Sequence, residues 1–548
     1  MLSIHIAECS NSILIFPFLD TCCSAMLSYA QIHFVLCFDE RDIMLTIQNL
    51  TLAHKKDLTV LIENLSFTVN PGERIALIGE EGNGKSTLLR AIYGDDAIDA
   101  YIEMSGRVTN TFHTGYLPQE LPAQDRTKSA YEYFCESPDF FDQTPRELGE
   151  LASRLRLPGD VFYSEQTMET FSGGERVKLQ LSRLMMSDPQ LLLLDEPSND
   201  LDMDTVRWLE EFLVSCGLAV LFVSHDETLL RRAATGVVLI ERLRRRQVPR
   251  AAFHRLDYEE FVQTRADLFA HQTQVARKER EELDKKMQRY NQIRQKVEHA
   301  QNTISRQDPQ GGRLLKKKMH AVTSMGRRFE REAQDMTDMP ESEEAIFAKL
   351  TCAPLPPSKV VLDLDLPELC IEGHILSRNI RLSVRGGEKV CITGKNGAGK
   401  STLLRAICNE IKSRHDLNVF YMPQDPGDLL DMEKTPIEMM TVEGGKEENV
   451  RICVALGSMK FTQDEMNHPC RGLSGGQKAK LMFLMMAQSG ADVLLLDEPT
   501  RNLSPLSGPV VRELFSQYPG CIVAVSHDAL FISQVCTRSI MLDKNGLM

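Results

Sequence analysis

The sequence lacks the features that mark metal-binding, disulfide-bonded and membrane-spanning proteins. Its 14 cysteines include no C-x-x-C pair, and the two closest, Cys22 and Cys23, are adjacent. This spacing fits neither a zinc site nor an iron–sulfur cluster and is typical of free thiols in a reducing compartment. After Met44 no apolar run approaches the roughly 20 residues that a membrane-spanning helix needs. These absences favour a cytoplasmic protein.

Residues 1–43 differ from the rest of the chain. They contain apolar stretches at 13–18 and 32–38 and no Lys or Arg among the first 40 positions. A signal peptide begins with basic residues, and Asp20 would interrupt a spanning helix. From Met44 the text MLTIQNLTL reads as a first β-strand. We interpret 1–43 as a non-native or dispensable extension before a natural start at Met44, with a weak membrane anchor as the alternative.

The charge is unevenly distributed. The 548 residues are too many for one core, and the net charge of −14 argues against nucleic-acid binding by the whole surface. Between Gln274 and Arg331, however, 16 Lys and Arg stand against 7 Asp and Glu. That segment carries +9 and the remainder −23.

The chain is built from an internal repeat. One block runs IALIGEEGNGKSTLLRAI, YLPQ, FSGGERVKLQLSRLMM, LLLLDEPSNDLD and FVSHD; the other runs VCITGKNGAGKSTLLRAI, YMPQ, LSGGQKAKLMFLMM, VLLLDEPTRNLS and AVSHD. Short apolar strands alternate with helical patterns, which predicts an α/β fold with a mainly parallel sheet in each copy. We place one domain at 44–243, a linker at 244–345 and the second domain at 346–548.

Each block contains a G-x-x-x-x-G-K-S loop between a strand and a helix. In this context the backbone N–H groups and the helix N-terminus bind phosphates, the Lys meets the β- and γ-phosphates, and the Ser can hold Mg²⁺. The sequence therefore predicts two ATP and Mg²⁺ sites. The predicted phosphate-loop residues are Gly79, Glu80, Glu81, Gly82, Asn83, Gly84, Lys85, Ser86 and Thr87 in copy one, and Gly394, Lys395, Asn396, Gly397, Ala398, Gly399, Lys400, Ser401 and Thr402 in copy two.

Acidic residues follow the next buried strand of each copy. The Asp is suited to a Mg²⁺ contact and the following Glu to polarising an attacking water. A Gln and a His in each copy are suited to sensing the γ-phosphate, the Gln together with the metal. We predict metal contacts from Ser86, Gln119, Asp195, Ser401, Gln424 and Asp497, and catalytic roles for Glu196, His225, Glu498 and His527.

A glycine-rich motif before a helix completes each block. This motif, S-G-G followed by Glu or Gln, is the signature of the ATP-binding-cassette superfamily, and together with the phosphate loops it makes the chain resemble that superfamily. In its members ATP lies between the phosphate loop of one cassette and the signature of the other. The resemblance implies that Lys85 shares a site with the second signature and Lys400 with the first, in a monomer whose cassettes pack on each other. The signature residues are Ser172, Gly173, Gly174 and Glu175, and Ser474, Gly475, Gly476 and Gln477.

The first phosphate loop departs from the family pattern. Glu80 and Glu81 stand where Lys-Asn or Arg-Asn is usual, as at Lys395 and Asn396. Two carboxylates beside a triphosphate should weaken binding unless they point to solvent. The two sites are therefore predicted to be unequal.

Smaller departures follow the same trend. The first signature begins with Phe171 rather than Leu, and Ser504 stands where copy one has Asp202. No clear aromatic residue is placed to stack on adenine. His54 in copy one and Ile371 in copy two are the candidates for that position.

The linker reads as two helices around a turn. From Tyr258 to Ser305 no Pro or Gly interrupts the helical pattern. We predict a turn at 308–312, a second helix after it, and an antiparallel coiled-coil hairpin. The predicted seam consists of three runs of apolar residues at intervals of seven: Phe261, Leu268 and Val275; then Leu283, Tyr290, Val297 and Ile304; then Leu315, Val322 and Phe329, with Met319 offset by four.

Basic residues concentrate at the predicted tip of this hairpin. One-signed charge favours contact with a nucleic-acid backbone, although a solvated helix face is the alternative. The tip residues are Arg306, Arg313, Lys316, Lys317 and Lys318.

Two cassettes with a helical linker resemble the ABC-F subfamily, whose linker enters the ribosomal E site towards P-site tRNA. The resemblance implies an ATPase that acts on ribosomal RNA and P-site tRNA, either as a translation factor or in protection from antibiotics, without a stable membrane partner. An ATP-binding subunit of a transporter is the alternative, and a DNA-handling ATPase fits less well.

Overall fold

The computed structural model describes residues 4–9, 12–17, 45–111, 113–199, 201–242, 248–303, 309–334, 336, 350–371 and 373–547. The chain divides into two compact units, Met1–Ile43 and Met44–Met548. In the first unit, β1 (Ile4–Cys9) and β2 (Ser12–Pro17) form an antiparallel pair. None of the described helices is long and apolar enough to cross a membrane.

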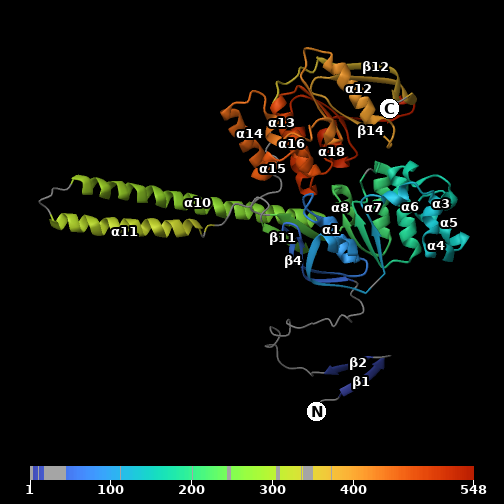
Figure 1. Ribbon diagram of the computed structural model, residues 1–548, viewed down its shortest axis with the longest axis horizontal. Coiled ribbons are helices and arrows are strands. Elements are labelled where there is room, and N and C mark those ends of the chain that lie inside the picture. The colour runs from blue at the N-terminus through green and yellow to red at the C-terminus, as the bar shows by residue number, and fades with distance from the viewer. Residues whose placement is uncertain are drawn as a thin grey trace. The chain divides into compact units, whose positions relative to one another are not determined.

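The second unit begins with the sheets of cassette 1 (Figure 1). An antiparallel sheet has the order β4-β3-β6, from β3 (Leu45–His54), β4 (Val60–Val69) and β6 (Ile102–Asn110). A larger sheet has the order β11-β10-β5-β9-β8-β7 and is parallel except for its β10–β11 pair. Its strands are β5 (Arg74–Ile78), β7 (Thr114–Leu117), β8 (Leu191–Asp195), β9 (Ala219–Val223), β10 (Gly236–Arg242) and β11 (Val248–His254).

Helices cover the larger sheet, and several short helices lie in the segment between the phosphate loop and the signature. The α-helices are α1 (Lys85–Tyr93), α2 (Ala123–Arg126), α3 (Ala130–Cys135), α4 (Pro138–Asp142), α5 (Pro145–Arg154), α6 (Gly173–Met186), α7 (Met203–Ser215) and α8 (Glu227–Ala233). The 3₁₀ helices are η2 (Asp96–Ala100), η3 (Val161–Tyr163) and η4 (Met168–Thr170).

Cassette 2 repeats this arrangement. Its sheet order, β15-β16-β17-β14-β18-β19, matches the order of cassette 1 strand for strand, with a separate antiparallel pair β12-β13. The predicted repeat and α/β fold are therefore confirmed. The strands are β12 (Val360–Ile371), β13 (His374–Arg385), β14 (Lys389–Thr393), β15 (Val419–Met422), β16 (Val493–Asp497), β17 (Cys521–Val525), β18 (Arg538–Asp543) and β19 (Gly546–Leu547).

The helices of cassette 2 also follow the order of cassette 1. The α-helices are α12 (Lys400–Lys412), α13 (Pro436–Met440), α14 (Lys446–Ser458), α15 (Gln463–Asn467), α16 (Gly475–Ser489), α17 (Gly508–Ser516) and α18 (Ala529–Val535). The 3₁₀ helices are η5 (Pro426–Asp428), η6 (Cys470–Gly472) and η7 (Pro505–Ser507).

The central strands are apolar without interruption because both faces of each sheet are covered. In β8, Leu191 and Leu193 pack in one core cluster, whereas Leu192 and Leu194 pack in the other. This burial on both faces is the reason why parallel strands lack an alternating pattern. The functional acidic residues come at the ends of these rigid strands.

The linker contains two long helices, α10 (Tyr258–Thr303) and α11 (Pro309–Gln334). Their pairing is antiparallel, because Lys286 contacts Glu332 at 2.9 Å and the ring centroids of Tyr290 and Phe329 lie 6.1 Å apart, while Gln301 bonds to the carbonyl of Leu315. The 46 residues of α10 correspond to about 70 Å of helix.

Parts of the linker differ from the sequence prediction. Pro309–Gly312 forms the first turn of α11 rather than a loop, because Pro is well tolerated at the first position of a helix. Leu268 is 63% exposed and takes no part in a seam, whereas Val297 and Val322 are buried. The predicted seam residue Ile304 and tip residue Arg306 lie outside the described residues.

The base of α10 belongs to cassette 1. Tyr258 and Phe261 are buried in its core cluster, and Arg265 forms an ion pair of 3.0 Å with the buried Glu241 of β10. Strand β11 continues the sheet to His254, beyond the position 243 at which the sequence places the boundary. The linker helix therefore starts from a rigid, packed support.

Candidate nucleotide sites

The two phosphate loops have nearly the same geometry. Gly79 and Gly394 have φ of 151° and 143°, and a Cβ at either position would lie 2.0 Å or 2.5 Å from a carbonyl oxygen of a neighbouring strand. Lys85 Nζ donates to the carbonyls of Gly79 and Glu80, at 2.9 and 3.0 Å. Lys400 Nζ makes the equivalent bonds, so both amines lie over their loops.

The two signatures begin helices α6 and α16. Ser172 accepts a hydrogen bond from the backbone N–H of Glu175, whose carboxylate accepts one from the N–H of Ser172. Ser474 and Gln477 form the same capping box. These side chains thus stabilise the helix starts while leaving the N–H groups of the following glycines directed outward.

Each signature lies against the phosphate loop of the other cassette. Glu81 Oε2 accepts a hydrogen bond of 2.6 Å from the N–H of Gly476. Gly173 of the first signature lines a cavity together with Lys400 of the second phosphate loop. The structure therefore brings together both pairs that the sequence prediction joins. We call the site of Lys85 and Gly476 site 1, and the site of Lys400 and Gly173 site 2.

In site 1 the carboxylate of Glu196 is surrounded by donors. Gln119 Nε2 and His225 Nε2 each lie 3.1 Å from a Glu196 oxygen, and Asn199 donates to the same carboxylate. Burial, the largest single influence, favours the neutral acid, but the hydrogen bonds from His225 and Asn199 and the positive charge of Lys85 together outweigh it and lower the pKa of Glu196 to about 2. The side chain is an anion held in one position.

His225 also spans the cassettes. Its Nδ1 lies 2.7 Å from the backbone carbonyl of Leu503 in cassette 2. Site 1 is therefore closed around Glu196 by residues of both cassettes.

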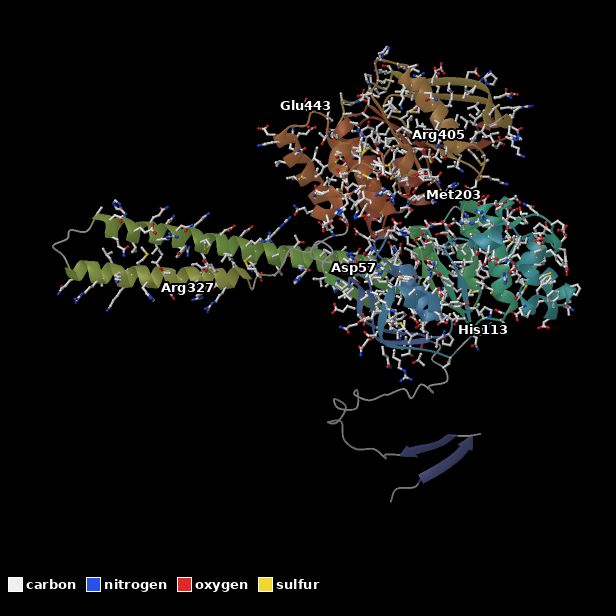
Figure 2. The ribbon with its side chains drawn as sticks, viewed as in Figure 1. Asp57, His113, Met203, Arg327, Arg405 and Glu443 are labelled. Carbon is white, nitrogen blue, oxygen red and sulfur yellow. The ribbon has the colours of Figure 1, made fainter. Side chains whose placement is uncertain are left out.

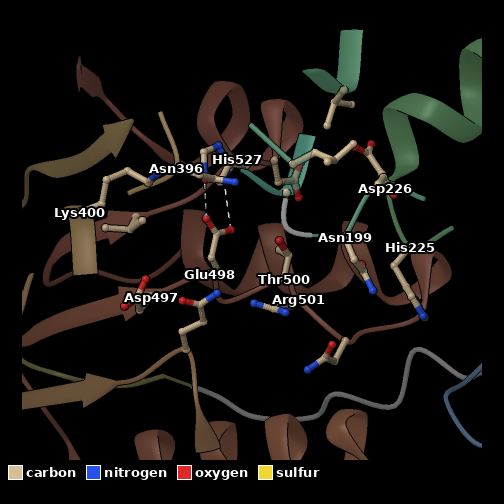
Figure 3. Close-up of a pocket in the computed structure, with 18 of the residues that line it drawn as sticks. Asn199, His225, Asp226, Asn396, Lys400, Asp497, Glu498, Thr500, Arg501 and His527 are labelled. Atoms are coloured by element: carbon tan, nitrogen blue, oxygen red, sulfur yellow. Dashed lines mark hydrogen bonds and ion pairs between the residues drawn. The ribbon is translucent and has the colours of Figure 1, made fainter. Parts of the chain in front are cut away.

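Site 2 has an open cavity of about 630 Å³, lined by both cassettes (Figure 3). Cassette 2 contributes Asn396, Lys400, Ser401, Thr402, Gln424, Asp497, Glu498 and His527, and cassette 1 contributes Gly173, Arg176, Ser198 and Asn199. This volume lies in the usual range for a site that binds a nucleotide-sized ligand.

The polar groups of site 2 are less completely paired than those of site 1. Glu498 accepts from the N–H of His527 at 3.3 Å, and burial raises the pKa of Glu498 to about 8. Burial also lowers the pKa of His527 to about 4. His527 Nδ1 and Asp497 Oδ1 are buried without a hydrogen-bond partner among the described residues.

Both glutamates have an unusual backbone conformation. Glu196 and Glu498 lie in the left-handed region, with φ of 49° and 50°. A non-glycine residue there costs about 1–3 kcal/mol and persists where the surrounding structure imposes it. The same strain at equivalent positions of both repeats indicates a requirement for the direction of these side chains.

The proposed adenine positions differ between the sites. Ile371 lines the site 2 cavity together with Leu376 and offers an apolar surface. His54 lies near Tyr101 in cassette 1, with ring centroids 6.4 Å apart. The role of either residue in base binding stays a prediction.

Comparisons with known proteins agree with this geometry. A profile of the ABC transporter domain matches residues 62–199 and 377–501. ABC transporter F family member 5 of Arabidopsis thaliana is 26% identical over 541 residues, covering 90% of this chain and 74% of its own length. The ribosome protection protein VmlR of Bacillus subtilis is 28% identical over 499 residues, covering 90% and 85%. The chain contains two ATP-binding-cassette domains, and over most of its length it is similar to proteins of the ABC transporter F family.

The fold of the whole chain is also found among solved structures. The archaeal ribosome recycling factor aABCE1, in its complex with stalk protein aP1, superposes with a TM-score of 0.55 at 17% identity. The match covers 91% of this chain and 90% of aABCE1. The predicted family and fold are thus confirmed, and the cassettes are P-loop ATPase domains that use ATP.

The acidic residues at the ends of β8 and β16 fit Mg²⁺. Ser86 Oγ donates to Asp195 Oδ1 at 3.0 Å, and burial raises the pKa of Asp195 to about 6. In site 2, Asp497 Oδ1 has no partner among the described residues. A hard cation with oxygen ligands would satisfy these atoms, with Gln119 or Gln424 beside them.

Several interface residues were not predicted from the sequence. Lys480 forms an ion pair of 2.6 Å with Glu80, and Arg512 one of 2.8 Å with Glu227. All four side chains are at most 11% exposed. Lys480 could have been suspected, because it follows Gly476 by one helical turn and so lies on the same face of α16. The partner of Arg512 had no signal in the sequence.

Proposed function

We propose that this ABC-F protein is an ATPase that acts on the ribosome through the helical pair α10–α11. The observation that carries the proposal is the net charge of +9 between Gln274 and Arg331, on a chain whose remainder carries −23. Basic side chains stand along its outer surface, Arg327 among them (Figure 2). The name of the relative VmlR, a ribosome protection protein, supports the same direction.

The hydrolytic cycle follows from the residues of the composite sites. Lys85 and Lys400 would leave their loop carbonyls to meet the phosphates, and Mg²⁺ would supply charge neutralisation of the triphosphate. Glu196 and Glu498 would orient and polarise the attacking water. Because each site has residues from both cassettes, ATP binding draws the cassettes together and hydrolysis releases them.

The helical pair would transmit this movement to RNA. The base of α10 is fixed in cassette 1 by Tyr258, Phe261 and the pair Arg265–Glu241, so the pair moves with that cassette. Its far end would enter the ribosomal E site and contact ribosomal RNA and P-site tRNA. General translation support and protection from antibiotics are both compatible with that position.

The first test neutralises the far end of the pair. Arg313, Lys316, Lys317 and Lys318 are exposed, and none has an ion pair with a described residue. Their joint replacement by Gln removes up to four phosphate contacts, so the slope of log affinity against log salt should fall by about 3. Ribosome affinity should fall at least about tenfold, measured by sedimentation from about 50 to 200 mM salt.

A matched control separates local charge from net charge. Lys56, Lys446, Arg451 and Lys544 are exposed on the cassettes, and their replacement by Gln changes the net charge equally. The control variant should bind ribosomes like the wild type. Equal salt slopes for the two variants would contradict RNA contact by the helical pair. ATP turnover without ribosomes should survive in both, because neither set lies in a nucleotide site.

A further inference from the structure

A carboxylate of the first phosphate loop contacts the N-terminus of α16, the helix that follows the signature serine of cassette 2. Glu81 Oε2 accepts from the N–H of Gly476, and a Cβ at Gly475 would lie 2.8 Å from that same oxygen. An anion at a helix N-terminus is stabilised by the N–H groups and by the helix dipole. In a composite site, this is the place that receives the terminal phosphate of ATP, so Glu81 competes with it.

A buried ion pair reinforces this contact. Lys480 Nζ lies 2.6 Å from Glu80 Oε1, with side chains only 6% and 11% exposed. Desolvated charges hold each other strongly when both partners are present, and breaking such a pair leaves a buried charge. The sequence left open that Glu80 and Glu81 point to solvent; the structure shows that they contact the opposite cassette.

Site 2 cannot form the equivalent ion pair. The residues that correspond to Glu80 and Lys480 are Lys395 and Lys178, both cations. Lys178 instead lies over the ring of Trp208, with Nζ 4.8 Å from the centroid. Like charges repel, so Lys395 and Lys178 cannot hold the second phosphate loop against the first signature as Glu80 and Lys480 hold the first loop against the second.

The remaining polar groups follow the same division. In site 1, His225 reaches the Leu503 carbonyl and Glu196 is surrounded by donors. In site 2, His527 Nδ1 and Asp497 Oδ1 have no partner among the described residues, and both line an open cavity. The carboxylate of Glu196 in site 1 is thus paired with protein groups, whereas site 2 has two buried polar atoms without a partner among the described residues.

We propose that Glu80 and Glu81 determine the order in which the two sites take ATP. They hold site 1 closed on Lys480 and Gly476, so site 2 fills first and with higher affinity. ATP enters site 1 only when Glu81 leaves the N–H of Gly476 and Glu80 separates from Lys480. This inference concerns the ATP sites alone and needs no ribosome, so it stands or falls separately from the proposed function.

The test is photolabelling of the full-length protein with 8-azido-ATP and Mg²⁺, followed by mass spectrometry of labelled peptides from each cassette. The half-saturating concentration is independent of labelling efficiency. For the wild type, we expect the value for cassette 1 to exceed that for cassette 2 at least tenfold. The double variant Glu80→Lys/Glu81→Asn, which matches Lys395 and Asn396, should bring the two values within threefold.

A second variant leaves the phosphate loop intact. Lys480→Met removes the partner of Glu80 and should lower the half-saturating concentration of cassette 1 alone. This variant tests the proposal even if the double variant does not fold. Lys178→Met is the matched control on α6 and should leave the ratio of the two values unchanged. Equal values in the wild type, or an unchanged ratio in the Glu80→Lys/Glu81→Asn and Lys480→Met variants, would overturn the proposal.

Discussion

Replacement of both Glu196 and Glu498 by Gln should lower steady-state ATP hydrolysis by about 10²–10⁴-fold, the usual contribution of a positioned general base. Gln preserves the shape of each side chain but removes the charge that polarises the attacking water. The surrounding structure imposes the same backbone conformation on both residues, and Gln occupies the same space as Glu, so ATP binding should survive. Phosphate release and equilibrium binding of a fluorescent ATP analogue, measured on the same preparation, separate the two effects.

A suitable control is the Glu120→Gln variant, because Glu120 is exposed and pairs only on the surface with Arg126. Its turnover should match the wild type. Hydrolysis by the double variant at more than about a tenth of the wild-type rate would contradict the assignment of both glutamates.

The two single variants should differ strongly. If site 1 is closed by its own carboxylates, most turnover occurs at site 2. Glu498→Gln alone should then lower the rate nearly as much as the double change, whereas Glu196→Gln should retain about a third or more of it. The physical reason is that Glu196 is already saturated by Gln119, Asn199 and His225.

The measurement is steady-state turnover with saturating ATP and Mg²⁺, at matched concentrations of folded protein. Equal residual rates for Glu196→Gln and Glu498→Gln would remove the case for unequal sites. They would leave the assignment of the glutamates themselves intact, because that assignment depends on the double variant.

Contiguous motifs made much of the fold predictable. The phosphate loops, the signatures and the runs that end in Asp195 and Asp497 are local patterns, and their repetition defines two α/β domains with the same strand order. The sequence also indicates the long helical pair, since about 45 residues without Pro or Gly have few other structures.

Contacts between distant residues could not be predicted in the same way. Glu80 and Lys480 lie 400 residues apart, and only the packing of the cassettes makes them partners. The two carboxylates of the first phosphate loop depart from the family pattern, but both have hydrogen-bond or ion-pair partners in the other cassette. The sequence shows which side chains are charged, but only the fold shows which groups they contact.

The linker shows the limits of local rules. Pro309 and the glycines at 311 and 312 favour a turn, yet they begin α11, where Pro needs no hydrogen-bond partner for its nitrogen. Leu268 fits the seven-residue spacing but is exposed, because α11 pairs only with the more distant part of α10. Spacing alone does not say where a partner helix ends.

The proposal of ribosome action is tested most directly by sedimentation of the Glu196→Gln/Glu498→Gln protein with ribosomes through a sucrose cushion. With ATP and Mg²⁺, the non-hydrolysing protein should pellet with ribosomes, and with ADP it should stay in the supernatant. Adding the Gln replacements at Arg313, Lys316, Lys317 and Lys318 should abolish the ATP-dependent pelleting. Pelleting that is independent of both ATP and these basic residues, or its absence under all conditions, would contradict action on the ribosome through the helical pair.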